Sequence, residues 1–492
     1  MSPTNFKAGV AKEEITPSIG IRTYYGRSTE IDLPLFTKAL VLDDGKQPIA
    51  LCTNDLIRTD LELVTQARSV IEKNTGLLGQ NILFSASHTH EGPGLEGDYR
   101  NQYLQKLIDV VCTAWETRVP ARIGTAIGAL IGVHINRRNF YGPADPDVSV
   151  IRVDQRSKDP LALFFTFAMH GVVLGHRKYQ GISPDWIGHA TRQIEKEQGS
   201  GSIALFAQGP SGNINPYTSI GYTGFTNKGG TVEEAERIGK LLGLFTTVLA
   251  DQIQTTSNVR LSCATSYQRL WAEKSFDVFE RYQRILAHKK QSLQLLEQQK
   301  SPQEEIQRQK IIVSFLEEYG DLYFAVNQSR PRRENPEKSE IQVLGINDTR
   351  IIGLGGEYFN EYSLYIKEHA LNMGYKNVII AELANGAWWG YIPTEVAFQY
   401  EHGYSVFNAE IMSGLDPKAG QRIADTALQL IMQCGHPIEP PPTPITRLYL
   451  PNGEAYAVTP VTSSRLDRLR DSLPLHHELR MRRHERIRNL PN

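Results

Sequence analysis

Short apolar runs alternate with longer amphipathic stretches through the first half of the chain, from about residue 6 to residue 260. Runs such as 161–168 have the length and composition of buried strands, whereas 232–254 carries the 3.6-residue periodicity of a helix. Strands that alternate with helices favour a layered α/β domain over an all-β one. The expected strands are 39–42, 48–52, 81–84, 148–153, 161–168, 203–207, 340–346, 350–354 and 378–381, and the expected helices are 60–74, 103–118, 186–198, 232–254 and 419–434.

The composition is that of an ordinary globular protein, with 492 residues, 40% hydrophobic and 22% charged. A formal net charge of −1 gives no overall attraction to nucleic acid, and no apolar stretch is long enough for a membrane span. The first twenty residues lack the apolar segment of a secretion signal, and the four cysteines lie far apart in no metal or redox spacing. We therefore expect a cytoplasmic protein with reduced thiols and no nucleic-acid partner.

Two segments differ from this pattern. Residues 275–326 read as two charged amphipathic helices separated by a Ser-Pro break, which predicts an inserted helical hairpin. The hairpin could cover a site, make a subunit contact in a homo-oligomer, or simply pack at the periphery. Residues 436–492 begin with a proline-rich linker and end in a basic arm, so we expect the main domain to occupy 1–435.

A His-x-His pair, His88 and His90, follows an apolar run in the segment SASHTHEGPG. Residues two apart in an extended strand project to the same side, so both imidazoles could face one point. Imidazole is a common zinc ligand, and the end of a strand at a turn is a usual place for a site. A solvated pair of loop histidines is the alternative, because two ligands do not complete a site.

Four further strand-like runs end in polar or glycine-rich loops. His170 ends LALFFTFAMHG, Glu357 follows the glycine pair of IIGLGGEY, and Tyr391 lies in ANGAWWGYIPT. Between them, the loop of IALFAQGPSGNINPY contains Asn213 and Asn215, whose amides could stabilise an oxyanion. A lone histidine at such a place is more often a core or edge histidine with its hydrogen bonds satisfied, which is the alternative for His170.

Together these segments resemble the catalytic domain of the neutral ceramidases, a non-lysosomal family of amide hydrolases. The resemblance covers roughly residues 6–435. It is carried, in the family's order, by FKAGVAKEEITP, SASHTHEGPG, HINRRNFY, FAMHG with SPDWIGHA, GGEYF and GYIPT. It implies mixed β-sheets flanked by helices.

The resemblance also implies one catalytic zinc, held by His88, His170, Glu357 and Tyr391. A site with two histidines, one carboxylate and an open position is typical of catalytic zinc. His90 would then hydrogen-bond substrate, and His90 or Tyr391 would exchange protons during catalysis. Arg137, in the HINRRNFY segment, would lie near the site and bind an anionic or carbonyl group.

The chain departs from the family in the loop that carries its nucleophile. The family's loop reads close to SNxGDVSPN, whereas this chain has GPSGNINPY, so Asn213 stands at the aspartate and Asn215 at the serine assigned as nucleophile. An amide cannot attack a carbonyl, which excludes an acyl-enzyme at Asn215. The last residues also do not resemble the family's C-terminal β-sandwich.

We therefore expect a zinc-dependent hydrolase that cleaves an amide, or less favourably an ester, by metal-activated water. The expected substrate is a small or polar N-acyl compound rather than ceramide. Trp388 and Trp389 could line its pocket, or could equally be core residues. Two alternatives stay open, namely acyl transfer or cyclisation on the same scaffold, and a metal-containing binding protein without activity.

Overall fold

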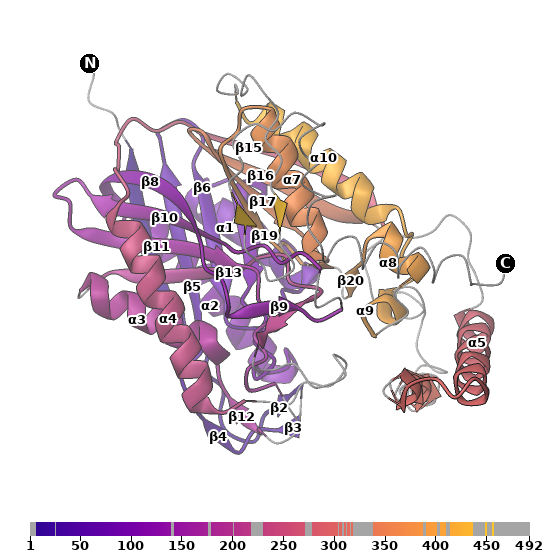
Figure 1. Ribbon diagram of the computed structural model, residues 1–492. Helices are drawn as coiled ribbons and strands as arrows, with labels where there is room; N and C mark the ends of the chain where they lie inside the picture. Colours follow the sequence, from indigo (N-terminus) through magenta and orange to yellow (C-terminus); the bar gives the residue numbers. More distant parts are fainter. Residues whose placement is uncertain are drawn as a thin grey trace.

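The computed structural model describes residues 6–435, together with 448–449 and 455–456. Within the first range it leaves out 25, 139–141, 176–178, 200, 218–229, 271–277, 304, 308, 311, 315, 318–337, 387–389, 401–403 and 410–413. The described residues form a layered α/β fold with two mixed sheets (Figure 1). The α/β fold class expected from the sequence is confirmed.

The larger sheet has eight strands. In spatial order they are β13 (Ile203–Gln208), β11 (Pro160–Phe167), β10 (Asp147–Gln155), β8 (Val119–Ala129), β1 (Lys7–Glu14), β5 (Phe36–Asp43), β6 (Ile49–Asn54) and β7 (Ile82–Ala86). The smaller sheet contains β15 (Leu261–Arg269), β16 (Lys338–Ile346), β17 (Thr349–Leu354) and β19 (Asn377–Ala381). The pairs β11–β13, β6–β7 and β17–β19 are parallel and the other pairs within these sheets are antiparallel, which makes both sheets mixed.

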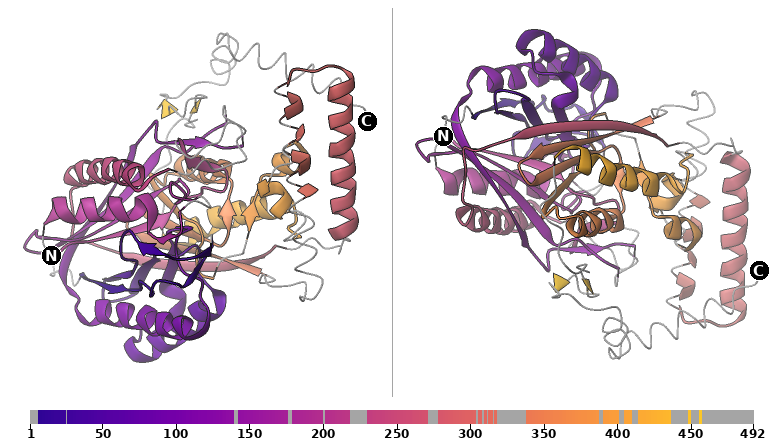
Figure 2. Two further views of the ribbon diagram at one scale, coloured as in Figure 1. Left: turned by 90° about the horizontal axis from the view of Figure 1, so that it is seen from below. Right: turned by 90° about the horizontal axis from the view of Figure 1, so that it is seen from above.

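Helices cover the outer faces of both sheets (Figures 1 and 2). The larger sheet is covered by α1 (Leu61–Thr75), α2 (Gly97–Glu116), α3 (Asp185–Gln198) and α4 (Val232–Asp251), and the smaller sheet by α7 (Asn360–Asn372) and α10 (Ala419–Gln433). Neighbouring strand residues point to opposite faces. In β17, Ile351 faces the core between the two sheets, whereas Ile352 packs toward α7 and α10. The result is four layers in the order helices, sheet, sheet, helices.

The short elements lie around the ends of these layers. They are β2 (Arg22–Thr23), β3 (Gly26–Arg27), β4 (Glu30–Ile31), η1 (Gly79–Asn81), β9 (His134–Asn136), β12 (Gly181–Ile182), β14 (Ile214–Pro216), β18 (Glu357–Tyr358), β20 (Tyr391–Ile392), α8 (Glu395–Tyr400), α9 (Tyr404–Phe407), β21 (Leu448–Tyr449) and β22 (Ala455–Tyr456). The pairs β9–β14 and β18–β20 carry several of the candidate site residues.

Every expected strand and helix overlaps an observed one, but the sequence did not predict β1, β8, β15 or α7. Glycine and proline interrupt β8, and charged residues end β1, so neither shows a strand pattern. The apolar residues of α7 are spread around the helix because the described layers bury it on several sides. Tertiary packing, not local periodicity, determines these elements.

The described part of 275–326 is mainly helical. Helix α5 (Val278–Gln298) runs beside the helical residues between 303 and 317 (Figure 2). The Tyr282 hydroxyl donates to the carbonyl oxygen of Leu316 at 2.9 Å, and the Gln309 amide donates to the carbonyl oxygen of Lys289 at 3.0 Å. The start of α5 thus lies beside the end of the second segment, so the two run antiparallel. Nearly all of 436–492 lies outside the described residues, so the linker and basic arm stay predictions. No described helix is long and apolar enough to cross a membrane.

Candidate metal centre

The His-x-His pair meets His170 at the edge of the larger sheet. β7 is an edge strand and ends two residues before His88. A parallel bridge between Thr89 and Gly171 brings the pair beside His170. Ring nitrogens of His88, His90 and His170 all lie within 4.8 Å of one another. In the described part of the chain this is the one such cluster of three or more histidine, cysteine or acidic side chains.

The backbone at His88 is a turn and not an extended strand. Its φ of 65° lies in the left-handed region, which costs a non-glycine residue about 1–3 kcal/mol. The expectation that strand geometry directs both imidazoles to one side is therefore wrong. The turn itself brings the His88 and His90 ring centroids to 4.8 Å. Gly171 permits the close approach, since a Cβ there would lie 2.9 Å from the His88 carbonyl oxygen.

His88 and His170 each use one ring nitrogen to bond a backbone carbonyl. Nδ1 of His88 lies 2.7 Å from the oxygen of Ile57, and Nδ1 of His170 lies 3.1 Å from that of Ile214. A carbonyl oxygen only accepts, so Nδ1 carries the proton in both neutral rings and Nε2 keeps a lone pair. Metal-binding histidines are typically fixed in this way.

The carboxylate of Glu357 faces both of these lone pairs. Its Oε2 lies 3.4 Å from Nε2 of His88 and 3.3 Å from Nε2 of His170. Nε2 of His170 and Oε2 of Glu357 are buried without a hydrogen-bond partner. Atoms that surround zinc tetrahedrally at about 2.0–2.1 Å lie about 3.3–3.4 Å from one another. The donor set therefore fits zinc.

The electrostatics favour the protonation states that a metal requires. Burial lowers the pKa of His170 to about 4, and the nearby Arg137 acts in the same direction. Burial, together with His88 and His170, also lowers the pKa of His90 well below its ordinary value. Although burial opposes ionisation of Glu357, the neighbouring histidines hold the pKa of its carboxyl well below the usual range. Metal binding needs neutral imidazoles and an ionised carboxylate.

Tyr391 lies beside Glu357 and His170. β18 and β20 pair in parallel with Glu357 opposite Tyr391, and the Tyr391 ring stacks with that of His170 at 6.5 Å between centroids. The phenol oxygen accepts a hydrogen bond from Nη2 of Arg137 at 3.0 Å. Burial raises the pKa of the Tyr391 phenol, and Arg137 opposes the rise. The phenol would thus ionise only with the help of a bound cation.

Arg137 joins the asparagine loop to Tyr391. Its Nη1 donates to Oδ1 of Asn215 at 3.1 Å, and its Nη2 donates to the carbonyl oxygen of Gly212 at 2.8 Å. Asn213 points elsewhere. Its Oδ1 accepts from the backbone N–H of Asn360 at 2.7 Å, and its Nδ2 donates to Glu361 at 2.9 Å. The structure brings Asn215 to Arg137 but directs the Asn213 amide to the first turn of α7.

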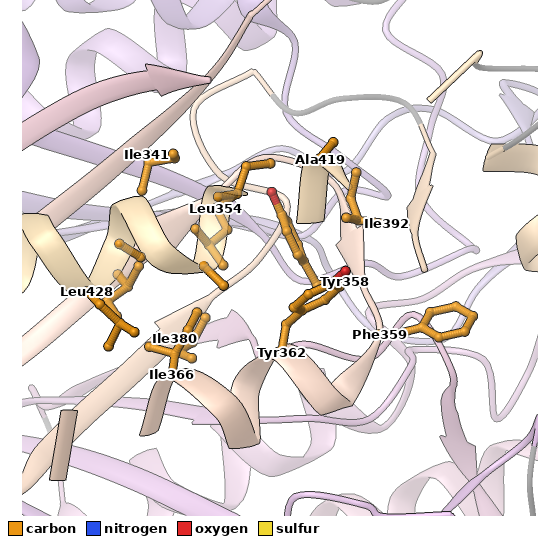
Figure 3. Packing of buried hydrophobic residues seen from close by; sticks show 14 of the residues in the cluster. Ile341, Leu354, Tyr358, Phe359, Tyr362, Ile366, Ile380, Ile392, Ala419 and Leu428 are labelled. Carbon is orange, nitrogen blue, oxygen red and sulfur yellow. The ribbon is translucent and has the colours of Figure 1, made fainter. Parts of the chain in front are cut away.

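The strand that carries Glu357 is anchored by its neighbours. Tyr358 packs its ring edge-on against Tyr362, within the apolar cluster between the smaller sheet and its helices (Figure 3). On its other side, the loop before β14 packs directly on the backbone of β18. A Cβ at Gly212 would lie 2.5 Å from the Glu357 carbonyl oxygen, so only glycine fits there. Core packing thus fixes the carboxylate's position.

Glu382 follows β19 and is completely buried, and no motif of the sequence indicated it. The available signal was an acidic residue at the end of the apolar run VIIAEL, because a buried carboxylate requires partners. Trp388 and Trp389 lie outside the described residues, so their place in a pocket stays a prediction.

Comparisons with known proteins agree with the sequence motifs. No protein-family model matches the chain. The chain is 28% identical over 237 residues to the neutral ceramidase of Mycobacterium tuberculosis, covering 39% of this chain and 37% of that protein. It is 27% identical over 172 residues to neutral ceramidase B of Dictyostelium discoideum, covering 28% and 24%. The crystal structure of neutral ceramidase from Pseudomonas aeruginosa superposes with a TM-score of 0.65 at 17% identity, covering 89% of this chain and 77% of that one.

These findings confirm the resemblance inferred from the motifs, and the superposition shows a shared fold. The matched segments span less than two fifths of the length of these curated relatives.

Proposed function

We propose that this relative of the neutral ceramidases is a metal-dependent hydrolase that cleaves an amide bond or, less favourably, an ester. His88, His170 and Glu357 would hold one zinc ion, with Tyr391 as the fourth ligand. The observation that carries the proposal is the set of buried Nε2 and Oε2 atoms, 3.3–3.4 Å apart, whose lone pairs face one another. When bound, zinc supplies a water of lowered pKa and polarises the substrate carbonyl.

His90 is suited to proton transfer. Its Nε2 lies 3.4 Å from Nε2 of His88, and its ring contacts that of Tyr24 edge-on at 5.2 Å. It is less buried than His88 and His170, so substrate could reach it. Because burial keeps the imidazole neutral near pH 7, His90 can accept a proton from water and return it to the departing amine.

Arg137 and Asn215 would stabilise the negative charge that develops on the carbonyl oxygen. Asn215 and Gly212 fix the guanidinium beside Tyr391. A cation that is already oriented requires no reorganisation during the reaction, and loss of one such donor typically costs a factor of about 10²–10³ in kcat.

The nearest serine in the loop is unsuited to covalent catalysis. Ser211 is completely buried, and its hydroxyl donates to Oε1 of Glu382 at 2.6 Å. Oδ1 of Asn215, at the position of the family's serine, accepts from Arg137. We therefore propose direct attack by water, with no acyl-enzyme.

The proposed substrate is an N-acyl compound, with small or polar members preferred to ceramide. The test is a comparison of metal-stripped and zinc-loaded protein on short N-acyl amino acids, N-acyl amines and long-chain ceramide, with both products measured. Zinc-dependent release of acid and amine, with solvent ¹⁸O in the acid after one turnover and no covalent adduct, is expected. Zinc-loaded protein that cleaves none of these would contradict hydrolysis, and new acyl products would indicate transfer instead. A preference for ceramide above about tenfold, or about 1.4 kcal/mol, would contradict the substrate proposal.

A further inference from the structure

Glu382 has a buried side chain, and its two oxygens act only as acceptors in the described hydrogen bonds. Oε1 accepts from the backbone N–H of Ser211 at 2.9 Å and from its hydroxyl at 2.6 Å, and Oε2 accepts from the backbone N–H of Tyr358 at 2.8 Å. Both side-chain oxygens therefore act as acceptors in the described bonds. The bonds span two segments that are far apart in sequence.

The backbone of Glu382 is tied to two further segments. Its N–H donates to the carbonyl oxygen of Gln208 at 2.8 Å, and its carbonyl oxygen accepts from the Ser85 hydroxyl at 3.2 Å. Gln208 ends β13, and Ser85 lies in β7. Side chain and backbone together thus join β7, the loop after β13, β18 and β19.

Tyr358 and Ser211, the two residues that the Glu382 side chain bonds, are each connected to a candidate metal ligand. Tyr358 directly follows Glu357, so the bond to its N–H fixes the backbone beside that carboxylate. Ser211 accepts from the N–H of Ile214 at 2.8 Å, and the Ile214 carbonyl in turn bonds Nδ1 of His170 at 3.1 Å.

We infer that Glu382 is a positioning residue that holds Glu357 and His170 at the separation needed to share one metal ion. The inference rests on the proposed metal site and extends it. Oε2 of Glu382 fixes the strand that carries Glu357, and Oε1 fixes the loop whose Ile214 carbonyl bonds His170. Glutamine would present an NH₂ group to one of the donors, and aspartate is shorter by one methylene.

A purely structural role makes a different prediction. If Glu382 only stabilised the fold, its loss would lower the melting temperature without changing metal affinity in the folded protein. If it positions the ligands, metal affinity falls even where the fold survives. Replacement of groups that orient ligands typically weakens metal binding by 10–100-fold.

The chain provides a matched control in Asp145. This carboxylate is also buried and also accepts from a serine hydroxyl, that of Ser363 at 2.7 Å, and from a backbone N–H, that of Asp147 at 3.1 Å. It additionally pairs with Lys367 at 2.6 Å. In the described contacts, the Asp145 side chain bonds none of His88, His90, His170 and Glu357.

The experiment measures the zinc dissociation constant by chelator competition and the melting temperature of the metal-free protein, for wild type, Glu382→Gln, Ser211→Ala and Asp145→Asn. We expect Glu382→Gln to weaken zinc binding by 10–100-fold and Ser211→Ala by a smaller factor, with a changed visible spectrum at saturating cobalt. Asp145→Asn should lower the melting temperature and keep the wild-type dissociation constant.

An unchanged dissociation constant in Glu382→Gln, or in Ser211→Ala if Glu382→Gln does not fold, would overturn the inference. Equal weakening in Asp145→Asn would also overturn it, because the effect would then be general destabilisation. A wild-type protein that binds no zinc would overturn the metal site as well. If the wild type binds zinc and the variants bind it equally well, only the proposed role of Glu382 would be overturned.

Discussion

Glu357 and Tyr391 lie directly opposite one another in the parallel pair β18–β20, although α7 and β19 separate them in the chain. Both belong to the part of the fold built around the smaller sheet, whereas His88 and His170 follow β7 and β11 of the larger sheet. The candidate metal centre therefore forms where the two sheets meet. Its geometry depends on how the sheets pack, and this dependence motivates the following predictions.

Protein purified without added metal should contain about one zinc per chain, and His88→Ala and His170→Ala should lose it. Each substitution removes one of two fixed imidazoles, and the remaining donors are too few for tight binding. Elemental analysis measures the metal content. His134→Leu replaces another buried histidine, one whose ring packs edge-on against Phe167, and should keep its zinc. Full zinc retention in both alanine variants would contradict the site.

The variants Tyr391→Phe and His90→Ala test whether Tyr391 or His90 is the fourth ligand. If Tyr391 is the ligand, Tyr391→Phe should weaken zinc binding by at least about tenfold, equivalent to about 1.4 kcal/mol. His90→Ala should then keep its zinc and lose kcat, because the proton-transfer group is missing. Chelator competition and steady-state kinetics on the same samples measure both. The opposite pattern would assign His90, whose ring nitrogen lies in the histidine cluster, as the ligand.

The two asparagines of the loop should behave differently when each is replaced by alanine. Asn215→Ala removes the hydrogen bond that helps to orient the Arg137 guanidinium, so kcat/KM should fall by about tenfold or more while the unfolding free energy changes little. Asn213→Ala leaves the buried N–H of Asn360 without its partner and should cost about 1–3 kcal/mol of stability. Urea unfolding and kinetics of both variants test this. A larger kinetic loss in Asn213→Ala than in Asn215→Ala would show that the roles are reversed.

His134 should make the metal-free protein sensitive to acid. Burial lowers its pKa from 6.5 to about 4, so between these values the unfolded chain binds a proton that the folded chain does not. The contribution of His134 to the free energy of unfolding is therefore fully retained above pH 6.5. It falls by up to about 3 kcal/mol as the pH drops to 4. Urea unfolding of wild type and His134→Leu between pH 7.5 and 4.5 measures the difference. Parallel pH profiles for the two proteins would contradict this role.

The sequence by itself determined most of the layers and several candidate donors. Apolar runs identified β5, β10 and β11, which are buried on both faces, and helical periodicity identified α1, α3 and α4. Strand ends marked His88 and His170, because a polar residue after a buried run lies at the edge of a sheet.

Only the tertiary structure decided which donors meet. No local pattern brings Glu357 within 3.3 Å of His170, since the two follow strands of different sheets. Nor could sequence show that Asn215 faces Arg137 while Asn213 faces α7, because α7 itself was not predicted. Glu382 was missed for the same reason. Local sequence fixes which residues form a strand or helix, whereas contacts between distant segments depend on the packing of whole layers.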